Sequence, residues 1–237
     1  PVLMRYSRDA NAAVRRESVI LMATLGQDAC GPITDALVDA DADNRERAAR
    51  ILFRLCPRLA VNVEGGNAKL RESIRLGNAS SYAFALLSRS AIDIDQQFVA
   101  AHLNKASSMV KAESWSRPVP LNVAATLAAS VMNLPNGNAA LSALLGEQRN
   151  AEFLATSIST TENRATLATL APLLLDRRAV TSGVPSHSKA RRRVCDVAAD
   201  QFVAALHLER EVAPRKVEVY SDADLTQLHV RALALNP

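Results

Sequence analysis

Two stretches near the start of the chain share one pattern of residue types, and this internal repeat constrains the fold more than any other feature. Residues 9–26 read DANAAVRRESVILMATLG, and residues 39–56 read DADADNRERAARILFRLC, at an offset of 30 residues. The matched positions include an acidic residue at the start (Asp9 and Asp39) and a basic residue within the helix (Arg15 and Arg45). A fixed period of this length is typical of architectures built from stacked helix pairs.

Each copy predicts one amphipathic helix. The Arg is followed by small residues three and four positions later and by apolar residues seven and ten positions later, so these side chains share one stripe. Small residues such as Ala48 and Ala49 are expected where a neighbouring helix comes close. Between the two copies, residues 32–38 are expected to form the second helix of a pair, with Pro32 in its first turn.

The ends of these helices are marked by local signals. Asp and Asn side chains are good N-caps, and the candidates are Asp9 or Asn11 for the first helix and Asp39, Asp41 or Asp43 for the second. Gly26 is placed to end the first helix, and Pro57 prevents the second from continuing.

The repeat resembles the HEAT-repeat family, in its short version with an aspartate-led turn, a Val-Arg dipeptide and a pair of small residues. Val14-Arg15 keeps that dipeptide, whereas Asn44-Arg45 departs from it at the first position. The resemblance implies an all-α fold, an α-solenoid of HEAT-like antiparallel helix pairs. It also implies a ladder in which each Arg reaches an Asp of a neighbouring repeat.

We expect the whole chain, 1–237, to be a single domain of this kind with roughly ten to twelve helices. The repeats are clearest in residues 1–60 and degenerate in 61–175, a polar basic loop covers 176–189, and 190–237 holds a C-terminal repeat and a cap. Only 4% of the residues are aromatic, and only eight are glycine. Such a core must be built from Ala, Leu and Val, which suits closely packed helices.

Capping residues and prolines predict where several later helices and connections lie. Asp93 or Asp95 is expected to cap a helix that continues to about Lys111, and residues 114–120, with two prolines, are expected to form a linker. Capping-box spacing opens two more predicted helices, one at Ser159 and Glu162 and one at Ser221 and Asp224.

The three cysteines are far apart, and each has apolar neighbours. Cys30, Cys56 and Cys195 show no disulfide framework and no metal-ligand spacing, so buried free thiols are expected. The sequence contains no apolar run of about 18 residues, and its first residues lack the apolar segment of a signal peptide. These features together favour a cytoplasmic protein.

No motif indicates catalysis. The four histidines lack an HExxH arrangement, and the SxxK spacing occurs twice without the motifs that accompany it in penicillin-binding enzymes. We therefore predict that the chain is not an enzyme and needs no cofactor or metal ion. Among HEAT-like enzymes, a DNA glycosylase is the less favoured alternative, because the single Trp, Trp115, lies in the proline-rich linker.

The best candidate for a binding site is a basic segment near the C-terminal repeat. The net charge is +4, and the excess lies within residues 177–193, in Arg177, Arg178, Lys189, Arg191, Arg192 and Arg193. Bases at the start of a helix oppose its dipole, so an acidic neighbour, a partner or phosphate groups would offset their cost. The segment is expected to be exposed and mobile.

A solenoid offers a long surface and needs no catalytic group, so the predicted function is a non-catalytic protein–protein interaction scaffold. The predicted partner is another protein, with an acidic surface opposite the basic segment. The alternative is a nucleic-acid-binding solenoid that uses residues 177–193, but no aromatic side chain for base stacking lies between residues 154 and 201.

Overall fold

The protein is mostly helical in the computed structural model, so its fold class is all-α as predicted. The structure describes residues 2–56, 63–77, 79–104, 109–111, 118–181, 192–209, 212 and 219–235. Pro57, residues 114–117 of the predicted linker, Trp115 among them, and most of the predicted basic loop lie outside these residues. The end of the predicted linker, Val119–Pro120, forms a strand and not a free connection.

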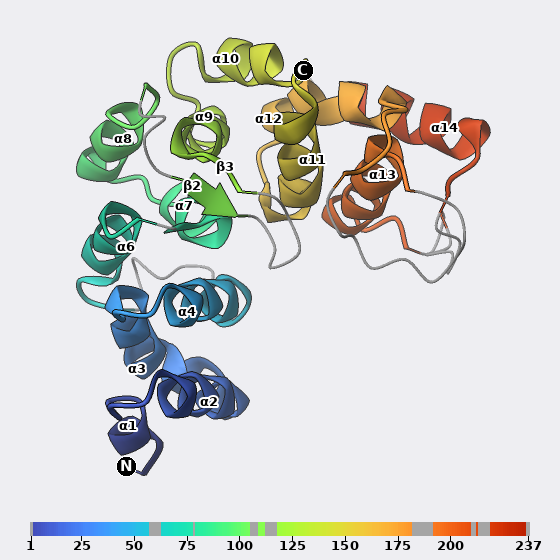
Figure 1. The fold of residues 1–237 in the computed structure, drawn as a ribbon. Coiled ribbons are helices and arrows are strands. Elements are labelled where there is room, and N and C mark those ends of the chain that lie inside the picture. Colours follow the sequence, from blue (N-terminus) through green and yellow to red (C-terminus); the bar gives the residue numbers. More distant parts are fainter. Residues whose placement is uncertain are drawn as a thin grey trace.

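The helices of the first half form successive pairs. Their bounds are α1 (Val2–Tyr6), α2 (Ala12–Met22), α3 (Cys30–Asp35), α4 (Ala42–Leu55), α6 (Gly66–Arg75), α7 (Ser81–Leu87), α8 (Asp93–Ala100) and α9 (Leu121–Val131). Short 3-10 helices, η1 (Ala23–Ala29) and η2 (Ala36–Val38), follow α2 and α3. Figure 1 shows two rows: α2, α4, α7 and α9 in an inner row, and α1, α3, α6 and α8 in an outer row. Contacts link successive members of the inner row and join the two rows within each pair.

The second half continues both rows and turns away from the first. Its helices are α10 (Gly137–Leu144), α11 (Gln148–Ser157), η3 (Ile158–Thr160), α12 (Arg164–Leu170), η4 (Ala171–Leu175), α13 (Val194–Ala205) and α14 (Asp222–Leu233). Helices α10, α12 and α14 contact one another in sequence, as do α11 and α13. The array therefore bends, with α2, α4 and α7 on one arm and α11 and α13 on the other arm of its inner side (Figure 1).

The chain also contains a small sheet that the sequence did not predict. Strand β1 (Ala79–Ser80) pairs in parallel with β2 (Met109–Lys111), which pairs antiparallel with β3 (Val119–Pro120). The predicted helix from Asp93 to about Lys111 is therefore wrong in its second half, because α8 ends at Ala100. The cap predicted for it is also wrong: the N-cap is Ile92, and no side chain fills that role.

Asp95 is a buried acceptor instead. Its carboxylate accepts hydrogen bonds from Asn67 Nδ2 and Ser90 Oγ, each at 2.5 Å, and pairs with Arg71. A carboxylate buried in this way needs partners of this kind, since an unpaired buried charge is costly. These bonds tie α6 to the start of α8.

The helix caps agree with the sequence where the signal is local. Asn11 caps α2, Asp41 caps α4 and Ser221 caps α14, each by accepting a hydrogen bond from a backbone N–H in the first turn. The predicted box at Ser159 and Glu162 is wrong, because Asn163 caps α12 and Glu162 pairs with Arg89.

The two predicted repeats have equivalent hydrogen bonds. Arg15 Nη1 donates to the carbonyl oxygens of Asp9 and Ala10, and Arg45 Nη1 donates to those of Asp39 and Ala40. The equivalent placement of the two arginines is confirmed, and both lie in helices, as expected.

The same arginines also connect one pair to the next. The Arg15 guanidinium binds both carboxylate oxygens of Asp39, at 2.7 and 2.8 Å. Arg45 Nη2 donates to the Gly77 carbonyl at 2.8 Å, so the second connection uses a backbone oxygen where the first one uses a carboxylate. The expected Arg-to-Asp ladder is thus formed at its first step and replaced at its second.

The core follows the small-residue stripe, with Ala48, Ala49 and Leu52 of α4 fully buried. Two of the cysteines do not match the prediction: Cys30 and Cys56 form a disulfide that joins the start of α3 to the end of α4. The prediction overlooked that helix pairing brings together thiols separated by 26 residues. Cys195 is free and buried, as predicted.

Candidate binding surface on helix α4

Four of the six basic residues predicted from the sequence are paired with acidic side chains of the same chain. Arg177 pairs with Asp222 at 2.8 Å, and Arg178 pairs with Asp176 at 2.5 Å. Arg178 also donates to the carbonyl oxygens of Gly146 and Leu145, at 2.7 and 3.0 Å. These contacts make Arg178 a bridge between the end of η4 and the loop before α11.

Arg192 and Arg193 are paired in the same way at the start of α13. Arg192 pairs with Asp200, and Arg193 pairs with Asp196 at 2.9 Å and donates to the Tyr220 carbonyl at 3.0 Å. Their side chains are only 14% and 24% exposed, so the expectation of an exposed segment is wrong for these two residues. Acidic groups inside the chain offset the helix-dipole cost.

Asp196 is the centre of this network. Its carboxylate is fully buried and also accepts from the backbone N–H groups of Arg193 and Tyr220. Burial alone would raise the pKa of Asp196, but these hydrogen bonds and the Arg193 charge outweigh it and hold the pKa below its ordinary value. Lys189 and Arg191, the other two predicted site residues, lie outside the described residues.

A second set of arginines lies on α4, and two of its members have no acidic partner among the described residues. Arg47, Arg50 and Arg54 follow one another at positions i, i+3 and i+7, which places them on one helical face. That face lies opposite the buried stripe of Ala48, Ala49 and Leu52. We call these three residues the α4 arginine face.

Two members of the α4 arginine face lack a side-chain partner among the described residues. Within the described part of the chain, Arg47 and Arg54 make no hydrogen bond or ion pair with a side chain, and Arg54 is exposed. The Arg47 Nε–H is buried and has no acceptor there. The exposed guanidinium of Arg54 can bind an incoming carboxylate through two parallel hydrogen bonds, which a lysine cannot do.

An aromatic cluster adjoins the α4 arginine face. The Arg50 guanidinium lies 5.6 Å from the centre of the Tyr82 ring, and Phe53 packs against Tyr82 at 5.5 Å. Arg89 lies 4.1 Å above the Phe53 ring and pairs with Glu162 at 2.6 Å. These cation–π contacts restrict the positions of the guanidinium groups, which lowers the entropic cost of binding.

Burial of the Arg89 guanidinium lowers its pKa, although the Glu162 carboxylate acts in the opposite direction. Through its contacts with Phe53 and Glu162, Arg89 connects the end of α7 with the Phe53 ring and the turn before α12. Glu162 itself is 73% exposed, so this pair marks the border of the cluster with solvent.

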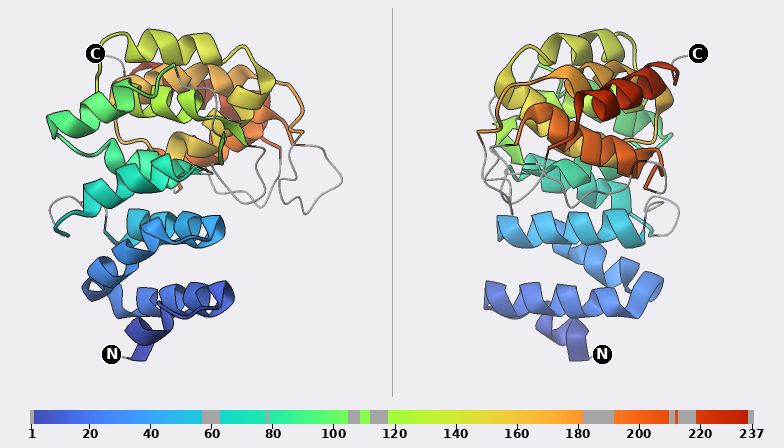
Figure 2. Two further views of the ribbon diagram at one scale, coloured as in Figure 1. Left: turned by 60° about the vertical axis from the view of Figure 1, so that its left-hand side comes forward. Right: turned by 90° about the vertical axis from the view of Figure 1, so that its right-hand side faces the viewer.

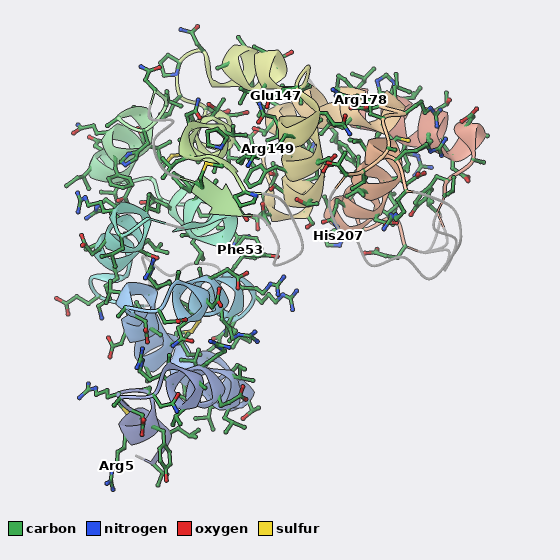
Figure 3. The ribbon with its side chains drawn as sticks, in the orientation of Figure 1. Arg5, Phe53, Glu147, Arg149, Arg178 and His207 are labelled. Carbon is green, nitrogen blue, oxygen red and sulfur yellow. A yellow bond between two sulfur atoms is a disulfide. The ribbon has the colours of Figure 1, made fainter. Side chains whose placement is uncertain are left out.

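The two arginine sets lie on different sides of the helix array. Figure 3 shows Phe53 at the inner corner of the bend, whereas Arg178 lies on the outer side, above α13. Long side chains with terminal nitrogens project from α4 toward the inner side in the same view. The α4 arginine face thus belongs to a helix of the inner row.

The signal for this surface was present in the sequence as RERAARILFR, residues 45–54. A search for dense runs of basic residues favours 189–193 and overlooks arginines that are spread at helical spacing. It also overlooks Asp196 and Asp200, which follow the basic run at the spacing needed to neutralise it.

Other kinds of site receive no support from the described residues. They hold no group of three or more His, Cys, Asp or Glu side chains that could bind a metal ion. Nor does any described helix combine the length and apolarity that crossing a membrane requires.

Comparison with known proteins leaves the family open. No family model matches the chain, and no curated protein is similar to it in sequence. Among solved structures, an engineered protein from the Northeast Structural Genomics Consortium is similar over 99% of this chain and 97% of its own, with 15% identity and a TM-score of 0.34.

Proposed function

We propose that the protein is a non-catalytic scaffold of HEAT-repeat type, an α-solenoid whose α4 arginine face binds an acidic segment of a partner protein. The observation that carries the proposal is the contrast in charge compensation. The described arginines near the C-terminal repeat are each paired with an aspartate, whereas Arg47 and Arg54 have no side-chain partner among the residues that the structure describes.

The repeat geometry supports the HEAT-type part of the proposal. Arg15 and Arg45 make the same backbone contacts at an offset of 30 residues, and Arg15 reaches the next pair through Asp39. A stack of equivalent helix pairs presents successive helices of one row side by side, and this produces an extended surface for a partner.

The aromatic cluster favours carboxylates over nucleic acid as the ligand. Single-stranded nucleic acid is usually bound by stacking bases on open aromatic rings. Tyr82 is buried, and the described face of Phe53 is covered by Arg89 at 4.1 Å. The arginines can therefore still pair with carboxylates, while the rings offer little area for bases.

The test uses the full chain and a short fluorescein-labelled polyglutamate peptide, with a labelled single-stranded DNA of the same charge as the second probe. The variant Arg47→Gln/Arg54→Gln should weaken peptide binding about 3- to 10-fold at physiological salt, as expected for two ion pairs at the protein surface. Arg50 is left in place because its contact with Tyr82 contributes to the fold.

The matched control is Arg5→Gln/Arg8→Gln, which removes the same charge from exposed positions at the N-terminal end. Equal loss of peptide binding in both double variants would show a general charge effect and would contradict the proposal. Tighter binding of the DNA, lost in Arg47→Gln/Arg54→Gln, would assign the surface to nucleic acid instead.

A further inference from the structure

Arg89, beside the α4 arginine face, is fixed in position by contacts that leave most of its hydrogen-bonding capacity unused. Its guanidinium lies 4.1 Å from the centre of the Phe53 ring. A guanidinium offers five N–H donors in one plane. The one strong hydrogen bond that Arg89 makes among the described residues goes to the Glu162 carboxylate, at 2.6 Å. The Phe53 carbonyl lies 3.5 Å from Nη1, and the buried Nε–H has no acceptor there.

Glu162 reaches Arg89 from the second half of the chain, 73 residues further on. In both views of Figure 2 the turquoise segment with α6 and α7 lies between the blue helices and the yellow-to-red helices, so the pair forms where the two halves meet. The Glu162 side chain is 73% exposed, whereas that of Arg89 is 17% exposed. The carboxylate can therefore leave for solvent at little cost, because an ion pair with an exposed partner contributes little stability.

The position of Arg89 makes it accessible to the ligand of the neighbouring arginines. On α4, Arg50 lies one turn before Phe53 and Arg54 directly follows it. An acidic segment on the α4 arginine face therefore brings carboxylates close to the place that Glu162 occupies. A guanidinium that is already fixed on an aromatic ring loses little entropy when it exchanges one carboxylate for another.

We propose that Arg89 is a further binding residue of this surface and that Glu162 is its internal competitor, which occupies Arg89 until a carboxylate of the partner displaces it. The proposal rests on the proposed function and adds regulation to it. In the free protein one of the arginines is occupied by the chain's own carboxylate, so a partner with a single acidic residue gains little from Arg89. A segment with several acidic residues binds the α4 arginine face and Arg89 together, and this raises the local concentration of carboxylate at Arg89.

The experiment uses the full chain and the labelled polyglutamate peptide. Glu162→Gln removes the competitor and should tighten peptide binding about 2- to 5-fold at physiological salt, as expected for one ion pair at the protein surface. The matched control is Glu147→Gln, which removes the same charge from an exposed position before α11 that pairs with no arginine among the described residues. Figure 3 shows Glu147 well away from Phe53. Equal gains in the two variants would show a general charge effect and would overturn the proposal.

A second comparison identifies the arginine that Glu162 occupies. Arg89→Lys keeps the charge but can neither lie flat on the Phe53 ring nor bind a carboxylate through two parallel hydrogen bonds. In that background Glu162→Gln should tighten binding no more than the control does, and a gain that persists would overturn the proposal. Circular dichroism checks that each variant folds. If Arg89→Lys does not fold, the comparison of Glu162→Gln with Glu147→Gln still decides the outcome.

The failure of this proposal is distinguishable from the failure of the proposed function. If the double variant of the α4 arginine face weakens peptide binding but Glu162→Gln gives no gain, only the role of Glu162 is overturned. If Glu162→Gln tightens binding through Arg89 while the double variant behaves like its control, the α4 arginine face is overturned and the exchange at Arg89 stands. Absence of peptide binding to both the natural chain and Glu162→Gln would overturn both.

Discussion

The region of α2 and α4 and the region of α13 both contain arginine–aspartate pairs, but the pairs connect different parts of the structure. Arg15 and Asp39 are 24 residues apart and connect one helix pair to the next. Arg193 and Asp196 are three residues apart and fix the start of a single helix. The first kind depends on how the helices stack, whereas the second forms largely within one segment.

The comparison explains why density of charge is a poor guide to a binding site in this protein. Arg192 and Arg193, the described members of the densest basic run, lie beside acids that neutralise them, while Arg47, Arg50 and Arg54 of α4 are spread along one helical face.

Removing the local network should have the largest effect. Asp196→Ala leaves the Arg193 guanidinium and the backbone N–H groups of Arg193 and Tyr220 without their acceptor. Breaking a buried pair by deleting one partner costs about 3–5 kcal/mol, and urea unfolding monitored by circular dichroism would measure it. Asp200→Ala is the control, since Asp200 is 40% exposed and should cost about 1 kcal/mol. Equal losses would mean that burial does not distinguish the two carboxylates.

Removing the connection between repeats should have a smaller effect. Arg15→Ala deletes the bonds to Asp39 and to two carbonyl oxygens, and it should reduce the free energy of unfolding by about 1–3 kcal/mol. In a double-mutant cycle with Asp39→Ala, Arg15 should show clear coupling. The same cycle between Arg45 and Asp39 should show little, because Arg45 binds the Asp39 backbone and not its carboxylate. Coupling of similar size in both cycles would contradict the ladder.

The smallest expected effect is the response of this connection to acid. Burial would raise the pKa of Asp39, but hydrogen bonds from Arg15, the Asp41 N–H and Asn44 outweigh it and leave the pKa lowered. A carboxylate with a lowered pKa contributes stability that is fully present above its unfolded pKa, near pH 4. That contribution is lost as the pH falls through the folded pKa. Acid titration of the free energy of unfolding should therefore be shallower in Asp39→Asn than in the natural chain, and parallel curves would contradict the assignment.

Whether a contact could be predicted from the sequence depends on how many residues separate its two partners. The caps Asn11, Asp41 and Ser221 were predictable, since each acts on a backbone group within its own first turn. Asp95 looked like another cap, but its partner Asn67 is 28 residues away, and only the packing of α6 against α8 brings them together.

The candidate surface was missed for a related reason. The sequence shows the spacing of Arg47, Arg50 and Arg54, but not which of them find acidic partners after folding. Arg193 shows the converse, because its partner Asp196 is visible three residues away and was not weighed. The disulfide between Cys30 and Cys56 depends on the pairing of α3 with α4. The repeat predicted that pair of helices, but not that it brings the two sulfur atoms together.

That disulfide has a mechanical consequence. A stack of helix pairs under tension between its two ends extends by separating neighbouring pairs and then by unravelling individual helices. Cys30 and Cys56 enclose α3 and α4 in a covalent loop, so a pulling force passes through the sulfur atoms and bypasses the residues between them. The residues between the two cysteines would therefore not extend under force while the rest of the array did. A reducing agent that cleaved the disulfide would allow them to extend as well.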